Sequence, residues 1–453
     1  MTDAASVAVT RPAPTALYRW VVLFLVSFTM CGNYYIYDSI NPLERIVHDQ
    51  LGFSASMFGW LNASYSVAAV LTLLAGGIIV DKFGTRKSVL FFAVLCLLGA
   101  VLTAAKGSFT LMVTGRTVLG LGAESEIVAV TTALAKWFRG KELSFALGIN
   151  LTIARVASVA ADNSPSWAKW AFYPQGPNGA ASWQRPLLIA TIAGAFAVLT
   201  AILYWVFETH AEGRFELGAA GSIDKLEARG IFSFTRSFWY VTILCFTFYS
   251  AIFPFRTFAI DFFTNKILGG MGGIHASEAA IVVAHRQAGF FNSMLPFSAM
   301  IVTPLFGLLS DKIGKRATLM MLGSLLLMPV YLMMGYTNIS LFVPVAMMGV
   351  AFSLIPAVMW PSVAYIVEEK RLGTAYALMG LIQQVGFFAL NLAIGKANDV
   401  AGAGLENVRG YIPGMWIFST LGFIGLAFAF LLRQRELGPH GHGLETITAG
   451  STK

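Results

Sequence analysis

The sequence has few charged residues and few cysteines. Only 12% of its 453 residues are charged, whereas a soluble globular chain usually has about 25%. Hydrophobic residues make up 57% of the chain, so the composition excludes an ordinary soluble domain and predicts a protein that crosses a membrane several times. The three cysteines (Cys31, Cys96 and Cys245) lie in apolar runs and lack metal-ligand spacing. We therefore expect buried thiols and no disulfide framework.

Groups suited to catalysis are also scarce. None of the six histidines lies in the middle of an apolar run, and no set of nucleophile, base and orienting group or of metal ligands is evident. We therefore expect no enzymatic activity, no cofactor and no bound metal. The net charge of +8 does not predict a nucleic-acid partner, because the basic residues lie mostly in short segments between the apolar runs.

Long apolar runs occupy most of the chain, and a helix needs about 20 such residues to cross a bilayer. In the first half, runs of this length fall near 17–38, 56–80, 87–105, 110–135, 142–167 and 186–208. In the second half, they fall near 236–263, 283–310, 317–336, 339–366, 371–396 and 411–433. The sequence therefore predicts an all-α membrane protein with twelve transmembrane helices in two six-helix bundles.

The longest polar stretch, residues 209–235, divides these runs into two sets. It predicts an N-terminal bundle (17–208), a linker and a C-terminal bundle (236–433), with tails at 1–16 and 434–453. Most of the 31 Lys and Arg residues fall on the side of the two termini, which predicts that both termini are cytoplasmic. We expect no cleavable signal and, in tails this short, no soluble domain.

One short motif occurs twice. "GIIVDKFGTRK" (77–87) follows the second run and "GLLSDKIGKRA" (307–317) follows the eighth. Both predict a tight turn whose glycines permit positive φ. The aspartates are expected to cap helix ends or to pair across the two halves, with the arginines as partners. The residues assigned to these gating loops are Gly77, Asp81, Gly84, Arg86, Gly307, Asp311, Gly314 and Arg316.

Two opposite charges lie at similar depth in neighbouring runs. Glu124 in "GAESEIV" and Arg155 in "NLTIARVAS" are almost equally far from the turn that joins the fourth and fifth runs, near the bilayer centre. An ionised group there costs roughly 2.5–3.5 kcal/mol on insertion scales, so it indicates a functional site. Either the two form a salt bridge that locks the hairpin, or they clamp the ammonium and carboxylate groups of a substrate. Both can hold if substrate opens the bonded pair.

Other polar residues in the runs are candidates for the same cavity, each with an alternative. Asp38 either titrates or ends a helix at the interface, and Arg256 either attracts anionic groups or extends to the headgroups. Tyr65 and Trp360 either face the cavity or anchor the interface, and Gln383 is a further candidate.

Two charged residues are expected to lie away from the cavity. Arg116 is expected to brace the bundle. Glu126 is rotated by about 200° from Glu124 around a helix, so we expect it to face a neighbouring helix, and its role stays open.

The doubled motif resembles the loop signature of the major facilitator superfamily. "RTVLGLG" (116–122) is similar to the arginine–glycine signature in that superfamily's fourth helix. The resemblance implies two six-helix bundles that rock about a central site.

Within that superfamily the chain resembles the family of lysosomal dipeptide uniporters. The resemblance is carried by "YIYDSINP", by "GAESEIVAVTTALAKWFRGKELSFALGINLTIARVAS", by "AIFPF" and by "WPSVAYIVEEKRLGTAYALMGLIQQVG". It implies that Glu124 and Arg155 are the substrate-binding acid and arginine and that Trp360 is a pocket tryptophan. Glu126 and Arg256 stand where that family has uncharged residues, so we expect a different substrate range.

These observations together predict an alternating-access transporter for small zwitterions, above all dipeptides, bound between Glu124 and Arg155. One alternative is a proton-coupled carrier of organic anions, suggested by three intramembrane arginines. Another is a non-transporting sensor with the same fold. The tails show no acidic dileucine signal, so we expect the plasma membrane of a prokaryote and not a lysosomal membrane. The expected partners are the substrate and the lipid bilayer, with protons in the anion alternative; the sequence does not indicate an accessory subunit.

Overall fold

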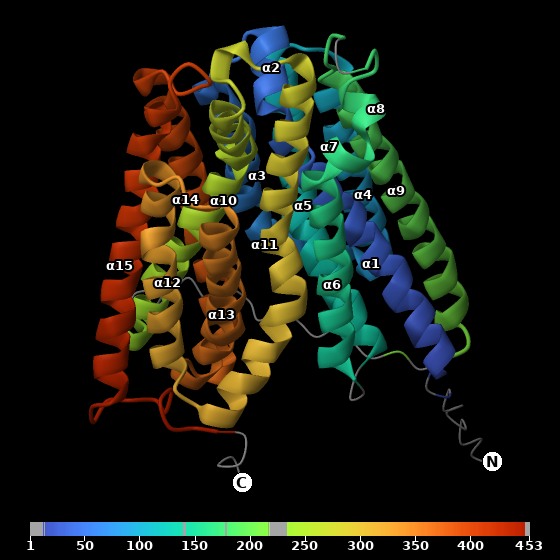
Figure 1. Ribbon diagram of the computed structural model, residues 1–453. Coiled ribbons are helices and arrows are strands. Elements are labelled where there is room, and N and C mark those ends of the chain that lie inside the picture. Colours follow the sequence, from blue (N-terminus) through green and yellow to red (C-terminus); the bar gives the residue numbers. More distant parts are fainter. Residues whose placement is uncertain are drawn as a thin grey trace, which may run out of the picture.

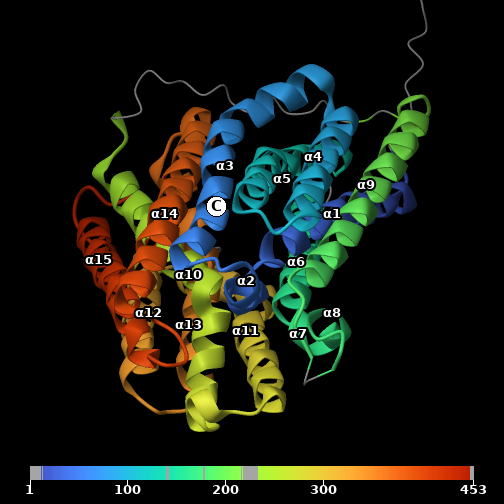
Figure 2. The same ribbon diagram turned by 90° about the horizontal axis from the view of Figure 1, so that it is seen from above.

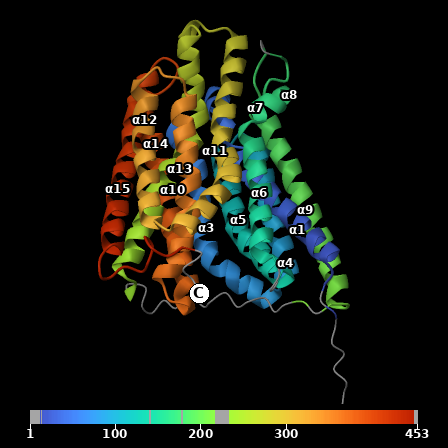
Figure 3. The ribbon, with the colours of Figure 1, turned by 60° about the horizontal axis from the view of Figure 1, so that its bottom comes forward.

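Long helices joined by short turns make up the computed structural model, which describes residues 12, 14–138, 142–176, 179–215, 217 and 233–448. In these residues eleven helices are long and apolar enough to cross a membrane. A bent pair, Ala55–Leu73 with Ala75–Phe83, makes a twelfth span with an angle of 51° between its parts. Figure 3 shows this bend in α3 on the side of the chain termini. The predicted all-α fold with twelve spans is confirmed.

The spans form two bundles (Figure 1), each with six of the long helices. The first contains α1 (Ala16–Asp38), α3 (Ala55–Phe83), α4 (Thr85–Ala105), α5 (Phe109–Trp137), α6 (Leu143–Asp162) and α9 (Gln184–Glu212). The second contains α10 (Arg236–Gly270), α11 (Glu278–Ile313), α12 (Arg316–Tyr336), α13 (Phe342–Ile366), α14 (Leu372–Ala401) and α15 (Ile412–Glu436). The connections hold α2 (Glu44–Leu51), α7 (Ser164–Trp167), α8 (Lys169–Phe172) and the 3₁₀ turns η1 (Asn41–Leu43), η3 (Gly273–His275), η4 (Glu369–Arg371) and η5 (Val408–Tyr411).

The expected span limits differ from the observed ones by a few residues at most ends. The fifth span is shorter than expected, because α6 ends at Asp162 and a separate helix with Pro165 near its start follows. Pro165 has no N–H to donate to the helical hydrogen-bond pattern, and the helix is interrupted next to it. The expected linker 209–235 begins inside α9, and residues 216 and 218–232 lie outside the described part, as does most of the N-terminal tail.

Local sequence explains where several spans begin and how they meet lipid. Ser54, Thr235 and Ser277 each cap a helix by accepting a hydrogen bond from a backbone N–H of the first turn, at α3, α10 and α11. Large apolar side chains remain exposed on the outer helices, for example Ile192 and Leu308. Such exposure suits contact with hydrocarbon and would be a liability in water.

The two bundles meet along α3 with α14 and along α6 with α11, as the view from above shows (Figure 2). Glycines let the backbones approach closely at these two seams. A Cβ atom on Gly59 would lie 2.4 Å from the backbone oxygen of Asn391, and one on Gly395 would lie 2.6 Å from that of Ala55. On the other seam, a Cβ atom on Gly289 would lie 2.5 Å from the backbone oxygen of Asp162.

Polar contacts between the bundles gather at the end of the molecule that holds α2, α7 and α8, which we call the distal side (Figure 1). There the carboxylate of Asp399 accepts hydrogen bonds from the N–H groups of Ala55 (2.8 Å) and Ser56 (3.0 Å) at the start of α3. The Arg45 guanidinium donates to Asn265 at 2.9 Å. Within the described residues, hydrogen bonds between the bundles occur on this side or at mid-depth, so the distal side is closed.

The two loops predicted to act in gating only partly match their predicted contacts. Positive φ is confirmed at Gly84 (79°) and Gly314 (71°), whereas Gly77 and Gly307 lie inside α3 and α11. The predicted caps are wrong, because neither α4 nor α12 has a side-chain cap.

The arginines of the two loops have different partners. Arg316 pairs with Asp311 at 3.1 Å, but Arg86 pairs with Glu212 at 2.6 Å and not with Asp81. Neither aspartate pairs across the bundles within the described residues. In the second half, the C-terminal segment lies beside this loop, because Arg316 also donates a hydrogen bond to the backbone oxygen of Ile447.

The close α3–α14 seam predicts a steric effect on stability. We expect Gly59→Ala to lower the midpoint of thermal unfolding of the purified protein, because backbone atoms cannot move aside as a side chain can and overpacking costs about 1–3 kcal/mol. Gly148→Ala is the matched control, since nothing lies within 4 Å of a Cβ atom there. Equal midpoints for the two variants would contradict the close approach of the two helices.

Candidate functional site

A cavity of ≈ 190 Å³ lies between the two bundles at mid-depth. Its lining comes from α1, α3, α5 and α6 of the first bundle and from α10, α13 and α14 of the second. Among the side chains that line it are six of the seven predicted substrate-binding residues, namely Asp38, Tyr65, Glu124, Arg155, Trp360 and Gln383. Arg256, the seventh, is not part of the lining.

Glu124 is held in this cavity by neutral donors from both bundles. The Tyr65 hydroxyl donates to its Oε1 at 3.0 Å, and the Gln384 side-chain N–H donates to the same oxygen at 2.9 Å. No described residue donates to the other carboxylate oxygen. The sequence pointed to Gln383, which also lines the cavity, but the neighbouring Gln384 is the residue that bonds the acid.

Arg155 faces the same cavity and has no carboxylate partner. Its guanidinium carbon lies 5.7 Å from the ring centroid of Tyr34 and 5.6 Å from that of Phe352, which belongs to the second bundle. In the part of the chain that the structure describes, no Asp or Glu oxygen lies within 4.0 Å of it, so the salt bridge that would lock the hairpin is not formed. Aromatic faces stabilise a guanidinium by about 0.5–2 kcal/mol and leave its N–H donors free.

The second bundle contributes aromatic side chains to the cavity. The indole N–H of Trp360 donates to the Tyr249 hydroxyl at 2.8 Å, and the Tyr376 hydroxyl donates to the backbone oxygen of Trp360 at 3.2 Å. Phe253 and Phe387 complete this wall. Trp360 and Tyr65 thus face the cavity, and their alternative as interface anchors is wrong.

A buried ion cluster lies at the distal ends of α1 and α6, the first and fifth spans. Arg256 on α10 is only 2% exposed and contacts Asp162 at 2.6 Å and Asp38 at 3.3 Å. The Asn41 amide also donates to Asp162 at 3.1 Å and to Asp38 at 3.3 Å. The alternative in which Arg256 extends to the headgroups is therefore wrong. Asp162 was not singled out from the sequence, where it reads as an ordinary helix end.

Two other charged residues lie away from the cavity, as expected. Arg116 is 1% exposed and donates to Asn62 at 2.8 Å and to the backbone oxygens of Tyr37 and Leu61. It therefore braces α5 against α1 and α3. Glu126 is buried and accepts a hydrogen bond from the Cys96 thiol on α4 at 3.3 Å, which confirms that it faces a neighbouring helix.

Comparison with known proteins identifies the fold and the family. The model of the Major Facilitator Superfamily matches residues 23–389 and 257–447. The lysosomal dipeptide transporter MFSD1 of Danio rerio is 31% identical over 393 residues, which are 85% of this chain and 82% of that protein. The same transporter of Homo sapiens is 30% identical over 396 residues, covering 85% of this chain and 81% of that protein.

Solved structures with the same fold have lower sequence identity. One is a bacterial homolog of the human lysosomal transporter Spinster, in an inward-facing and occupied conformation. It has a TM-score of 0.71 and 15% identity, and covers 93% of this chain and 98% of that chain. The nucleoside transporter NupG has a TM-score of 0.68 and 13% identity, and covers 92% and 98%. The chain therefore belongs to the major facilitator superfamily and is an integral, multi-pass secondary transporter of the membrane, not an enzyme.

Proposed function

We propose that this transporter carries small zwitterions, dipeptides in particular, by alternating access. One observation carries the proposal: a carboxylate and a guanidinium face one cavity between the bundles without pairing with each other. A dipeptide has an ammonium group at one end and a carboxylate at the other, so it supplies both missing partners. MFSD1 relatives at about 30% identity, named as dipeptide transporters, support this substrate class.

Each end of the substrate would meet a group suited to it. The ammonium group would bind the oxygen of Glu124 that no protein donor reaches, while Tyr65 and Gln384 hold the other oxygen in place. The carboxylate would take two parallel hydrogen bonds from Arg155, whose planar donor set matches carboxylate geometry. Charge-assisted hydrogen bonds contribute about 1.5–3 kcal/mol each, so both ends matter to affinity.

The aromatic wall of the second bundle suits substrates with varied side chains. Tyr249, Phe253, Trp360 and Phe387 present ring surfaces with few polar atoms. Such surfaces accept many apolar groups with small differences in free energy, about 1–3 kcal/mol per methylene at most. We infer that the first bundle recognises the charged ends and the second bundle accommodates the rest of the substrate.

The ion cluster would serve as the distal lock of the alternating-access cycle. Arg256 belongs to the second bundle, whereas Asp38 and Asp162 belong to the first, so opening of the distal side must break both contacts. We propose that the termini face the cytoplasm of a prokaryote, which makes the distal side the outer side. In that orientation the structure has its outer side closed.

The organic-anion alternative loses its main support when the three intramembrane arginines are compared. Arg116 is bound to backbone oxygens and Asn62, and Arg256 is bound to two carboxylates. Arg155 alone of the three faces the cavity without an anionic partner, and Glu124 balances its charge. The cavity therefore suits a substrate of no net charge.

Removal of either charge is expected to lower dipeptide transport strongly. In liposomes that contain purified protein, we expect Glu124→Gln and Arg155→Ala to lower dipeptide flux at least about tenfold, because each loses one charge-assisted contact. Glu126→Gln is the matched control, since it removes a carboxylate from the same helix on the face away from the cavity, and its flux should stay close to wild type.

The same assay separates the two transport hypotheses. Unchanged flux in both cavity variants would contradict the proposed clamp. Carboxylate uptake that depends on a pH gradient, with no dipeptide flux in the wild type, would favour the organic-anion carrier.

The proposed lock makes a separate prediction about stability. Arg256→Gln leaves two buried carboxylates without their cation, and loss of one partner of a buried pair costs about 3–5 kcal/mol. We expect this variant to unfold at a lower temperature than the triple variant Asp38→Asn, Asp162→Asn, Arg256→Gln, in which no buried charge is left in the cluster. A triple variant less stable than Arg256→Gln would show that the cluster does not act through charge compensation.

A further inference from the structure

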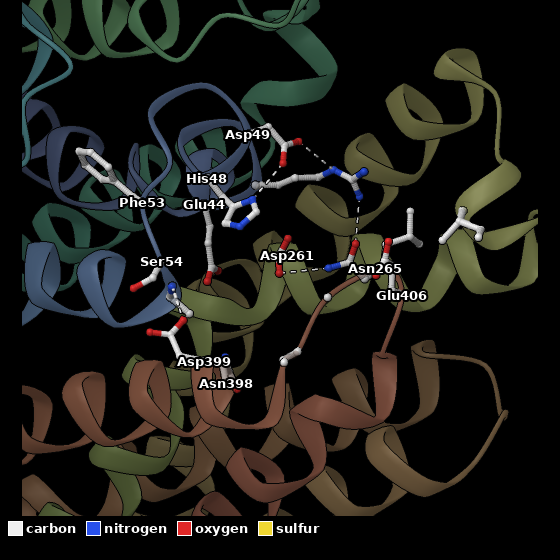
Figure 4. Close-up of a pocket in the computed structure, with 17 residues that line it drawn as sticks. Glu44, His48, Asp49, Phe53, Ser54, Asp261, Asn265, Asn398, Asp399 and Glu406 are labelled. Atoms are coloured by element: carbon white, nitrogen blue, oxygen red, sulfur yellow. Dashed lines mark hydrogen bonds and ion pairs between the residues drawn. The ribbon is translucent and has the colours of Figure 1, made fainter.

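A second and larger cavity, of ≈ 630 Å³, lies on the distal side (Figure 4). The first bundle contributes Glu44 and Asp49 of α2, and the second contributes Asp261 of α10, Asp399 of α14 and Glu406. These five carboxylates face one positively charged arginine, Arg45. The cavity therefore has an excess of negative charge and is lined by both bundles.

Most of these carboxylates have partners within the protein. Asp399 accepts hydrogen bonds from two N–H groups at the start of α3. Asp261 accepts hydrogen bonds from Asn265 (3.1 Å) and from the Tyr411 hydroxyl. Asp49 pairs with Arg45 at 3.7 Å and lies beside His48. Arg45 therefore already has partners, Asn265 and Asp49.

Glu44 differs from these three carboxylates because it is buried and, among the described residues, unpaired. It is only 7% exposed, and its Oε2 atom is buried without a hydrogen-bond partner. Figure 4 shows its side chain directed into the cavity, toward the side where Asp261 and Asp399 lie. A buried carboxylate without a partner costs several kcal/mol. The described residues therefore leave the Glu44 carboxylate without a partner, and a bound ligand could supply one.

The chemistry of the lining selects the kind of partner. No group of three or more His, Cys, Asp or Glu side chains among the described residues is arranged to hold a metal ion. The volume lies within the range of about 300–1,000 Å³ that small-molecule sites have. Glu44 and Asp261 both line this cavity, and carboxylates bind ammonium groups through charge-assisted hydrogen bonds.

We propose that this distal cavity binds a small organic cation through an ammonium group that contacts Glu44 and Asp261. The site is separate from the central cavity and does not depend on which substrate is transported. Because its two acids come from different bundles, a bound cation would join them and stabilise the closed distal side. The transporter would thereby respond to amines on that side of the membrane.

The probe for this site is 1,4-diaminobutane, with 1,4-butanediol as the neutral control of equal chain length. We expect isothermal titration of purified wild-type protein to detect binding of the diamine and not of the diol. Glu44→Gln should weaken the diamine at least tenfold. Glu278→Gln, which removes an exposed carboxylate outside this cavity, should leave its affinity unchanged.

Two results would overturn the proposal. One is diamine affinity that is equal in wild type and Glu44→Gln, since that would place the ligand elsewhere. The other is loss of diamine binding in Glu124→Gln together with its retention in Glu44→Gln, since the amine would then occupy the central cavity. Titrations at matched ionic strength with NaCl in place of the diamine separate specific binding from general screening.

Discussion

Compensation of charge inside the membrane is the constraint on which this structure depends. An ionised side chain away from water needs a partner, and the arginines of the spans meet this need in different ways. Arg116 is bound by backbone oxygens and an amide, and Arg256 by two aspartates. Both are nearly inaccessible to solvent. In the described part of the chain, the Arg155 guanidinium lies against aromatic rings and pairs with no carboxylate, and the hydrogen bonds to Glu124 come from neutral donors. In the central cavity, Arg155 and Glu124 thus each lack a partner of opposite charge.

The same residues that form the central cavity also connect the bundles. Gln384 donates to Glu124 from the opposite bundle, and Arg155 rests against Phe352 of that bundle. A ligand that binds Glu124 and Arg155 therefore lies directly beside contacts that join the bundles. Interfaces with alternative sets of contacts behave as two-state elements, so local binding can shift the balance between them. Binding of a ligand in the cavity can therefore affect the relative position of the two bundles directly.

Much of the fold could be predicted from the sequence because apolar length and basic residues report directly on membrane spans. That Glu124 and Arg155 lie at one level could be predicted as well, because their distances from the shared turn are similar, and both line one cavity. The partners of buried charges could not. Asp162 lies 94 residues from Arg256, and Gln384 lies 260 residues from Glu124. Such pairs depend on how two bundles dock, which no local pattern encodes. The site around Glu44 could not be predicted for the same reason, because residues of α10 and α14 complete its cavity.

The two bundles contribute different chemistry despite their repeated architecture. The loop motif occurs in both, yet the charges that face the central cavity come from the first bundle, and the second supplies rings and two amides. This division has a physical consequence. Charged contacts need fixed geometry, whereas ring surfaces tolerate a range of shapes. A carrier that recognises the two ends of a zwitterion with one bundle can keep those contacts while the other bundle moves. The asymmetry therefore suits a cycle in which the substrate stays bound to the first bundle until the seam along α3 and α14 rearranges.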